Sequence, residues 1–230
     1  MKISVCMAAY HGEKFIAQQL SSVLPQLSSE DEVLVSDDAP GGETQEIVLS
    51  FAQKDDRVRY LHGPGQGVVR NFEYLLGQAC GDVLFLCDQD DVWLPNKVQR
   101  VMESIESGAC LVLHDASVTD GALRVTEKSF FQKHGSKPGF IRNCLRNSYM
   151  GCCMAFTRQV ARNALPFPKN IPMHDQWIGL VAEKTGRVCF LNEPLLLYRQ
   201  HGGNVTGGAT TLRQKVSWRL SLLRAVLSKF

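Results

Sequence analysis

Short apolar runs alternate with helical patterns over the first 115 residues of the chain. The runs at residues 3–9, 32–36, 57–61, 82–87 and 110–114 predict β-strands, because turn residues bound each of them. Between the runs, apolar residues spaced three and four apart predict helices. Strands that alternate with helices predict an α/β fold, in which helices cover both faces of a mostly parallel sheet.

Turn residues and prolines indicate where two of these helices begin. Pro40–Gly42 predicts a turn, and Thr44 is expected to cap the helix that follows it. Pro95 is expected in the first turn of a helix that has Val98 and Val101 on its buried face, because a missing N–H costs little at that position.

The second half of the chain shows a weaker pattern. Residues 115–150 are polar and lack clear periodicity, so we expect loops near the site there rather than a separate domain. A strand at 152–156, a helix from about Arg158, a second helix and a strand at 188–191 are expected to follow. We therefore expect one domain over residues 1–211.

Residues 212–230 differ from the rest of the chain in charge and periodicity. They carry five Lys and Arg residues and no acid, and their apolar residues fall on one face of a helix. A cationic amphipathic C-terminal helix of this kind can lie at an anionic membrane surface, or it can pack on the domain as an ordinary terminal helix. The sequence leaves both possibilities open. The apolar stripe consists of Leu212, Val216, Leu220, Leu223 and Leu227.

Charge and cysteine content narrow the class of protein. The 25 Lys and Arg against 23 Asp and Glu give a formal net charge of +2, too small an excess for a protein that mainly binds nucleic acid. The eight cysteines form no C-x-x-C pair and lie mostly in apolar runs, so we expect reduced thiols. The N-terminal segment turns polar at Tyr10, and no run approaches the roughly 20 apolar residues of a membrane span. We expect a cytoplasmic protein, with contact to the inner face of the plasma membrane still open.

Asp88, Asp90 and Asp91 directly follow an expected buried strand, at the end where ligands bind in open α/β sheets. Three carboxylates this close repel one another unless a cation neutralises them, and Mg²⁺ or Mn²⁺ favours such oxygen ligands. A nucleoside diphosphate would complete the ligand shell of the ion. The competing interpretation is a solvated acidic turn that caps the next helix, and D-x-D alone does not decide between the two.

Three stretches of sequence favour a site over an acidic turn. They are ISVCMAAYHGE at 3–13, SDD at 36–38 and FLCDQDDVWLPNKV at 85–98. Together they resemble glycosyltransferase family 2, and the resemblance extends over nearly the whole chain. It implies a Rossmann-like fold of the GT-A type, a nucleotide-diphosphate-sugar donor and transfer with inversion at the anomeric carbon.

The resemblance also implies roles for the acidic residues. Asp37 or Asp38 would contact the nucleobase or ribose, since the family has an acidic residue at the end of its second strand. Asp88 and Asp90 match the D-x-D motif, so Asp88 is expected in the donor site, and Asp90 and Asp91 are the candidate metal ligands.

The sequence departs from the family pattern at two places. DDAPGG at 37–42 stands where the family more often has a run like D-D-G-S-T-D, and His11 stands where an Asn is more usual. Both carboxylates are kept. The changed turn can alter donor affinity or base preference, because the hydroxyl side chains of the family pattern are missing.

Asp175, in the segment MHDQW at 173–177, is the candidate general base. Inverting transfer needs a carboxylate that takes the proton of the acceptor hydroxyl as its oxygen attacks the anomeric carbon. The local pattern alone favours an N-cap of the helix that begins near Trp177. The resemblance favours the base, because related transferases have an acidic residue before an aromatic one in this region. His174 is then expected to be a neighbouring partner rather than a catalyst.

Two further pairs of residues are candidates for donor binding. Arg199 and His201 lie in a polar loop that closes over the diphosphate in related enzymes, so Arg199 would bind its oxygens and His201 would add a nitrogen ligand to the metal. Arg70 and Asn71 follow the glycine-rich segment at 62–67 and are expected near the donor at a helix N-terminus. Plain surface loops are the competing interpretation for both pairs.

The stretches NSYMGCCMAF, PFPKNIPMHDQW and EPLLLYRQHGGN extend the resemblance to rhamnosyltransferases of bacterial polysaccharide assembly. This implies dTDP-L-rhamnose as donor and a saccharide or lipid-linked saccharide as acceptor. One alternative is a nucleotidyltransferase, which would need a glycine-rich signature where this chain has AAYHGEKF. The other is a non-catalytic, membrane-associated protein that binds nucleotide sugars with the same fold, and only DDAPGG favours it.

Overall fold

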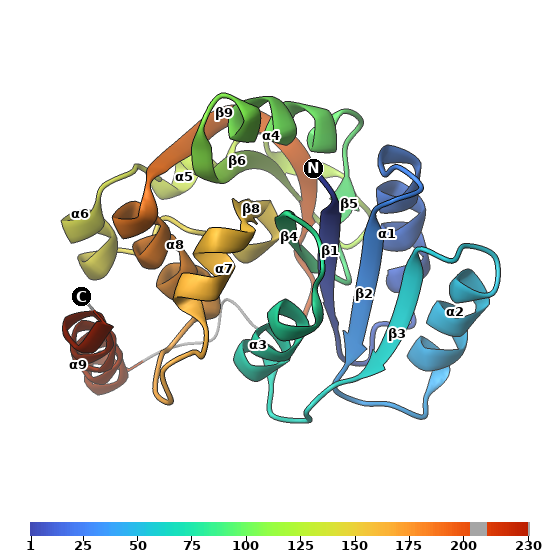
Figure 1. Ribbon diagram of the computed structural model, residues 1–230, viewed down its shortest axis with the longest axis horizontal. Coiled ribbons are helices and arrows are strands. Elements are labelled where there is room, and N and C mark those ends of the chain that lie inside the picture. The colour runs from blue at the N-terminus through green and yellow to red at the C-terminus, as the bar shows by residue number, and fades with distance from the viewer. Residues whose placement is uncertain (203–210, 230) are drawn as a thin grey trace.

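The protein is built around one curled sheet with helices on both faces (Figure 1). The computed structural model describes residues 1–202 and 211–229, the latter without the side chains of 212–216. Within these residues the strand order is β3-β2-β1-β4-β8-β6-β9-β5, and β7 pairs with β6. The expected α/β class is therefore confirmed.

The first half of the sheet is parallel, as its apolar runs predicted. It consists of β1 (Ile3–Ala9), β2 (Glu32–Asp37), β3 (Val58–His62) and β4 (Val83–Asp88). β1 lies between β2 and β4, so the chain steps outward twice and then returns across the first strand. This reversal of strand order opens a crevice at the carboxyl ends of β1, β2 and β4, where α/β proteins bind their ligands.

Helices connect and cover the parallel strands. α1 (Ile16–Val23) and α2 (Glu43–Ala52) contact each other on one face, and α3 (Val68–Gln78) packs against β1 and β2 from the other. This division follows from right-handed crossovers, because the chain moves outward through α1 and α2 and back through α3. A short 3₁₀ turn, η1 (Leu24–Gln26), extends α1, and α4 (Lys97–Glu106) packs against β6.

The second half of the sheet is mixed, which corrects the expectation of a mostly parallel sheet. Its strands are β5 (Val92–Trp93), β6 (Ala109–Thr119), β7 (Val125–Glu127), β8 (Met154–Thr157) and β9 (Arg187–Arg199). β6 and β9 are parallel, whereas β8 runs antiparallel to both of its neighbours and β5 runs antiparallel to β9. Sequence patterns predicted the buried runs but not their direction, because a strand buried on both faces is apolar in either direction.

Short helices fill the second half of the chain. They are α5 (Phe130–His134), α6 (Phe140–Leu145), the 3₁₀ turn η2 (Gly151–Cys153), α7 (Arg158–Ala164) and α8 (His174–Thr185). α7 and α8 pack against each other, and α8 also contacts α3, so it joins the two halves of the fold.

The expectation of loops over residues 115–150 is wrong in part. β6 continues to Thr119, and β7, α5 and α6 follow within this segment. The buried Asp115 carboxylate organises it, since it accepts hydrogen bonds from the backbone N–H of Ala116 and Phe131 and from the Ser129 hydroxyl. These bonds join residues far apart in sequence, which local periodicity does not record.

Two expected helix starts are also wrong. α2 begins after Gly42, and the Thr44 hydroxyl instead accepts a hydrogen bond from the Gly12 N–H at 2.9 Å. α4 begins after Asn96, whose backbone is left-handed at φ 67°, so Pro95 lies before the helix rather than in its first turn. In both places a tertiary contact or a tight turn displaced the local capping preference.

α9 (Leu212–Lys229) confirms the expected C-terminal helix. The face that packs on the domain, however, is not the predicted apolar stripe. Leu222, Ala225 and Val226 are buried, and α9 contacts α6. The predicted apolar stripe faces outward where its side chains are described, and its members Leu212 and Val216 lie outside that part. Among the described residues, no helix has the length and apolarity that a bilayer crossing requires.

Candidate active site

The candidate acidic residues meet at one edge of the sheet. Ala9 at the end of β1 pairs with Asp37 of β2, and Ala8 pairs with Asp88 of β4. Asp37 and Asp88 therefore lie on either side of the end of β1, although 51 positions separate them in the chain. The sheet register thus brings the two predicted acidic clusters to one crevice.

All four carboxylate oxygens of Asp37 and Asp38 accept hydrogen bonds from backbone N–H groups or a hydroxyl. Asp37 is fully buried and accepts hydrogen bonds from the Ala39 N–H at 2.9 Å and the Tyr60 hydroxyl at 3.1 Å. Asp38 accepts from the N–H groups of Gly65 and Gly67 at 3.0 and 2.9 Å. Asp38 therefore fastens the glycine-rich segment to the end of β2.

A cavity of about 430 Å³ opens beside this pair. His11 and Glu13 line one side of it, and residues 39–44 line the other. The two departures from the family pattern, His11 and the turn after Asp38, are thus both lining residues. This placement makes them candidates for contact with a bound donor.

Arg70 and Asn71 lie at the start of α3, where each is held by the protein. The Arg70 guanidinium pairs with Glu73 and donates to backbone carbonyls of residues 167–169. Asn71 is buried and donates to the Ser36 carbonyl at 2.9 Å. Their contact with a donor stays a prediction.

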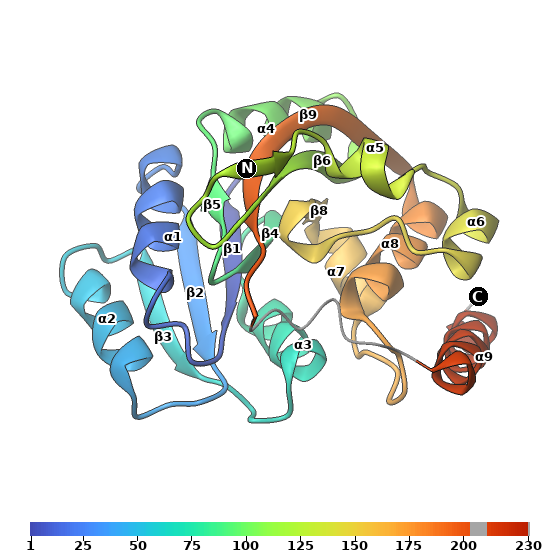
Figure 2. The same ribbon diagram turned by 180° about the vertical axis from the view of Figure 1, so that it is seen from behind.

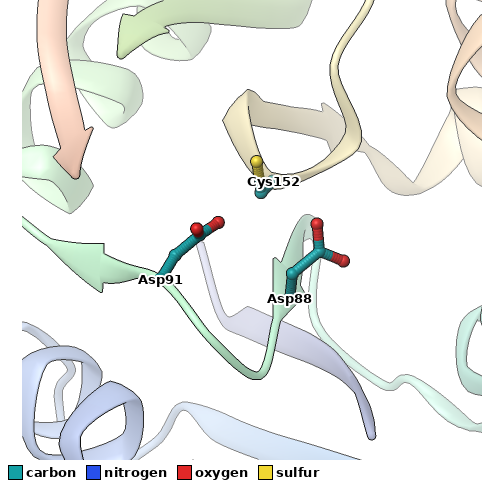
Figure 3. A group of neighbouring side chains, drawn as sticks. All are labelled: Asp88, Asp91 and Cys152. Carbon is teal, nitrogen blue, oxygen red and sulfur yellow. The ribbon is translucent and has the colours of Figure 1, made fainter. Parts of the chain in front are cut away.

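Asp88 and Asp91 form a close group with Cys152 (Figure 3). One carboxylate oxygen of each Asp and the Cys152 sulfur all lie within 4.8 Å of one another. Asp91 is fully buried, and one of its oxygens accepts a hydrogen bond from the Arg199 N–H at 3.0 Å. Its other oxygen has no hydrogen-bond partner among the described residues.

Asp90 points to a different partner. Its carboxylate lies 2.8 Å from Nε2 of His201, and the His201 ring packs beside Phe15 with centroids 4.8 Å apart. The structure therefore brings together Asp90 and His201, two of the predicted metal ligands that lie 111 residues apart. Asp91, the third, belongs to the neighbouring group with Asp88.

Burial and mutual repulsion raise the pKa of the carboxylates. Burial and the charges of Asp90 and Asp175 raise the pKa of Asp88 to about 7. The pKa of Asp91 is raised well above its ordinary value by burial and by Asp88 and Asp90. Carboxylates in this condition favour either a proton or a cation, so the group has the electrostatics of a cation site.

The cysteine beside them favours its protonated form when no ion is bound. A side-chain hydrogen bond with Cys153 and burial raise the pKa of the Cys152 thiol well above the ordinary value. A thiol that stays protonated is a poor ligand for a metal ion. The carboxylates and the His201 nitrogen are thus the groups able to hold an ion.

Arg199 forms hydrogen bonds with residues 88–91, which we call the acidic loop. It is 4% exposed, and its side chain donates to the carbonyls of Asp90 and Gly121 and to the side-chain oxygen of Gln18. A diphosphate would have to compete with these bonds. The predicted phosphate contact of Arg199 therefore stays a prediction, while its structural contact with the loop is plain.

Asp175 is the second residue of α8 and is 5% exposed. It is not the N-cap, because Met173 occupies that position. Its carboxylate accepts from the Gln176 N–H at 2.5 Å and from the Asn147 side chain at 3.4 Å. Burial raises the pKa of Asp175 to about 6, which suits a general base near neutral pH.

His174 lies beside Asp175 as a neutral packing residue. Its ring stacks on Phe72 with centroids 4.2 Å apart, and neither ring nitrogen has a hydrogen-bond partner among the described residues. Burial lowers the pKa of His174 to about 3. The expected partner role is thus one of packing rather than hydrogen bonding.

Two residues near the site were missed by sequence reasoning. Tyr10 follows β1 and is 61% exposed, although the Gln89 side chain holds its backbone N–H and carbonyl at 2.9 Å each. Lys97 is buried, and its ammonium donates to the Cys152 carbonyl at 2.9 Å and lies 4.1 Å from the centre of the Trp93 ring. An aromatic residue directly after a strand was the available signal for Tyr10. A lone lysine on a predicted helix gave none.

The sequence matches known proteins of one family. Glycosyl transferase family 2 matches residues 4–165. The chain is 25% identical to the dTDP-rhamnosyl transferase RfbG of Shigella flexneri, over 95% of this chain and 79% of that protein. It is 26% identical to the UDP-Glc:alpha-D-GlcNAc-diphosphoundecaprenol beta-1,3-glucosyltransferase WfgD of Escherichia coli, over 83% of this chain and 73% of that protein. An uncharacterized glycosyltransferase of Nostoc sp. is 26% identical over 89% of this chain, which spans 66% of that relative.

Solved structures share the fold. The structure of S. aureus TarS 1–349 in complex with UDP-GlcNAc superposes with a TM-score of 0.78 at 18% identity, over 100% of this chain and 66% of that one. The mannosyltransferase PcManGT from Pyrobaculum calidifontis, in complex with GDP-Man and Mn²⁺, gives a TM-score of 0.62 at 16% identity, over 99% of this chain and 62% of that one. At these identities the likeness shows the GT-A fold.

Proposed function

The chain belongs to glycosyltransferase family 2, and on that premise we propose that it transfers a sugar from a nucleotide-diphosphate-sugar to an acceptor hydroxyl with inversion. The observation that carries this proposal is the group of Asp88, Asp90 and the buried Asp91 at the carboxyl end of β4, with Asp175 close enough to raise the pKa of Asp88. One cluster that favours a cation and one carboxylate with a raised pKa are the two parts that inverting transfer requires.

The donor nucleotide would bind at the ends of β1 and β2. Asp38 lies beside the cavity there, and the exposed ring of Tyr10 offers a stacking surface for a base. Asp37 is buried behind Asp38 and would position it. The N-terminus of α3, with Arg70 and Asn71 in its first turn, would add a favourable field for phosphate.

The residues of the acidic loop fit a divalent cation. One buried Asp91 oxygen has no hydrogen-bond partner among the described residues, and the pKa values of Asp88 and Asp91 are raised, so the group favours a positive charge. Asp90, Asp91 and His201 would hold Mg²⁺ or Mn²⁺, since oxygen and imidazole ligands suit these ions. When bound, the ion supplies stabilisation of negative charge on the departing diphosphate.

Asp175 would act as the base. Its raised pKa and its place at the N-terminal turn of α8, across from β4, suit a carboxylate that takes a proton from the acceptor hydroxyl. The attacking oxygen would then approach the anomeric carbon from the face opposite the diphosphate. The Asn147 amide and the Gln176 N–H would keep the carboxylate in place.

We propose dTDP-L-rhamnose as the donor and a saccharide or lipid-linked saccharide of bacterial polysaccharide assembly as the acceptor. The resemblance over residues 147–204 and the similarity to a dTDP-rhamnosyl transferase support the donor. UDP-glucose is the alternative, because a relative of similar identity is named for it. A lipid-linked acceptor would bring the protein to the inner face of the plasma membrane.

A thermal-shift panel tests the donor. A ligand that binds only the folded protein raises its melting temperature. We expect stabilisation by dTDP and dTDP-rhamnose that requires Mn²⁺ or Mg²⁺, and little by UDP or GDP. Equal shifts with UDP-glucose would favour the alternative donor, and no shift with any nucleotide would count against nucleotide-sugar binding, and so against both the proposed function and its non-catalytic alternative.

A further inference from the structure

The helices α6 and α9 lie side by side at one end of the molecule (Figure 2), and both carry exposed apolar side chains. On α9, Leu220, Leu223 and Leu227 are 50%, 38% and 80% exposed. On α6, which contacts α9, Ile141 and Leu145 are 76% and 59% exposed. We call these five residues the α6–α9 surface. They include half of the exposed large hydrophobic residues in the described part of the chain.

The placement of these leucines follows from the helical period. Leu222, Ala225 and Val226 form the buried stripe of α9, so Leu220 and Leu227 fall on the opposite face and Leu223 lies on the flank between them. The exposed face is therefore not the edge of the packed one. α9 is anchored to the domain by one stripe and presents a second apolar stripe to the outside.

Positive charge surrounds the α6–α9 surface. Residues 134–147 and 212–229 contain eight Lys and Arg and no Asp or Glu, whereas the rest of the chain contains 17 Lys and Arg against 23 Asp and Glu. Arg142 and Arg146 on α6 are exposed, as are Arg219 and Arg224 on α9. The protein is thus divided into an acidic body and one basic end.

We propose that the α6–α9 surface docks on an anionic lipid bilayer. Apolar side chains rimmed by Arg on a helix that lies along the surface are the features of an interfacial helix, whose leucines enter the acyl boundary while its cations meet the headgroups. A second copy of this chain is a poor occupant, because a symmetric contact would bring the two basic ends together. A protein interface would also have less charge near its apolar core.

The docked orientation would suit the proposed function. In both views α9 lies level with the edge at which β1 and β2 end (Figures 1 and 2). Docking through α9 would therefore keep the crevice near the bilayer, where a lipid-linked acceptor is held. This last step rests on the proposed acceptor, whereas the docking itself depends only on the α6–α9 surface.

Vesicle sedimentation with the full chain tests the docking. We expect the protein to sediment with vesicles of phosphatidylcholine and phosphatidylglycerol, but not with phosphatidylcholine alone, and to be released by salt. Leu223→Ser/Leu227→Ser and, separately, Arg219→Gln/Arg224→Gln should each lower the partition coefficient at least about tenfold. Leu49→Ser, on an exposed position of α2, is the matched control and should bind like the wild type.

Three results would overturn the docking. They are no sedimentation of the wild type with anionic vesicles, sedimentation of both double variants like the wild type, and a dimer in light scattering that Leu223→Ser/Leu227→Ser dissociates. Melting curves with and without nucleotide separate this test from the proposed function, because the α6–α9 surface lies outside the crevice. A variant that loses vesicle binding but keeps the nucleotide shift supports docking, and loss of the nucleotide shift alone counts against the donor site.

Discussion

Two acidic pairs lie at the ends of β2 and β4, the strands on either side of β1, yet their surroundings differ. Asp37 and Asp38, after β2, accept hydrogen bonds from three backbone N–H groups and a tyrosine hydroxyl. Asp88 and Asp91, after β4, face each other and a protonated thiol, and one oxygen of Asp91 has no partner in the described part of the chain. The first pair is satisfied by the fold itself. The second is left in need of a cation.

This contrast separates recognition from chemistry within one crevice. A carboxylate that backbone donors hold in place presents a fixed shape, which suits discrimination between donors. Carboxylates that repel one another bind a cation and respond to charge on the substrate. Four experiments can break or sharpen the contrast.

The largest expected effect comes from the carboxylate outside both pairs. Asp175→Asn keeps the size of the side chain but removes the base, so we expect the transfer rate to fall about 10²- to 10⁴-fold. The metal-dependent nucleotide shift should persist, because the residue lies on α8 rather than on the acidic loop. Steady-state rates and melting curves measure the two. A variant that keeps full activity would remove Asp175 from the mechanism.

The next effect concerns the second pair and its neighbour Asp90. Asp90→Asn should weaken metal-dependent nucleotide binding at least about 10- to 100-fold. Mutation of a residue that only supports a metal ligand already lowers metal affinity by this factor, and loss of the ligand itself should lower it at least as much. Titration of Mn²⁺ and nucleotide by calorimetry gives the constants. Asp120→Asn, in an exposed turn with Arg124, is the control and should bind normally. Unchanged Mn²⁺ binding in Asp90→Asn would mean that the ion is held elsewhere.

A stability comparison tests the contrast directly. Asp37→Asn breaks hydrogen bonds of a buried group, so the free energy of unfolding should fall by about 1–3 kcal/mol with or without Mn²⁺. Asp88→Asn removes one of the repelling charges, so the protein should be no less stable in EDTA and should gain less from Mn²⁺. Urea unfolding under both conditions measures this. An equal loss of unfolding free energy in the two variants would show that the fold stabilises both pairs of carboxylates in the same way.

The smallest effect is on pH dependence. Burial and neighbouring charges raise the pKa of Asp88 in the folded protein from its ordinary value of 3.8 to about 7, so its contribution to stability is complete below the unfolded value and is lost as pH rises from there through about 7. In EDTA, the melting temperature should therefore fall between about pH 4 and about pH 7.5, by about 2–4 °C for each kcal/mol lost. Saturating Mn²⁺ should flatten the curve. Asp88→Asn should flatten it without metal, and a wild-type curve already flat in EDTA would contradict the assignment.

The sequence allowed the parallel half of the fold to be predicted better than the mixed half. Apolar runs such as Ile3–Ala9 are buried on both faces, and their pattern is local. β7, α5 and α6 depend instead on bonds such as Phe131 to Asp115, which no local pattern contains. In the site, motifs predicted Asp88, Asp90, Asp91 and Asp175 as functional residues, and the register of β1 explains why Asp37 and Asp88 lie at the same edge of the sheet. The bonds that occupy Arg199 arise only when β9 reaches the acidic loop, so no spacing argument could have predicted them.

Gln89, the middle residue of the D-x-D motif, links the loop after β4 to the loop after β1. Gln89 holds the backbone of Tyr10, and a Cβ added at Gly12 would meet the Gln89 side-chain oxygen at 2.0 Å. A larger residue at position 12 would therefore require the Gln89 side chain to move away from Tyr10. Among homologous sequences the two positions should vary together, so their pairing would mark the members that build the first loop in this way.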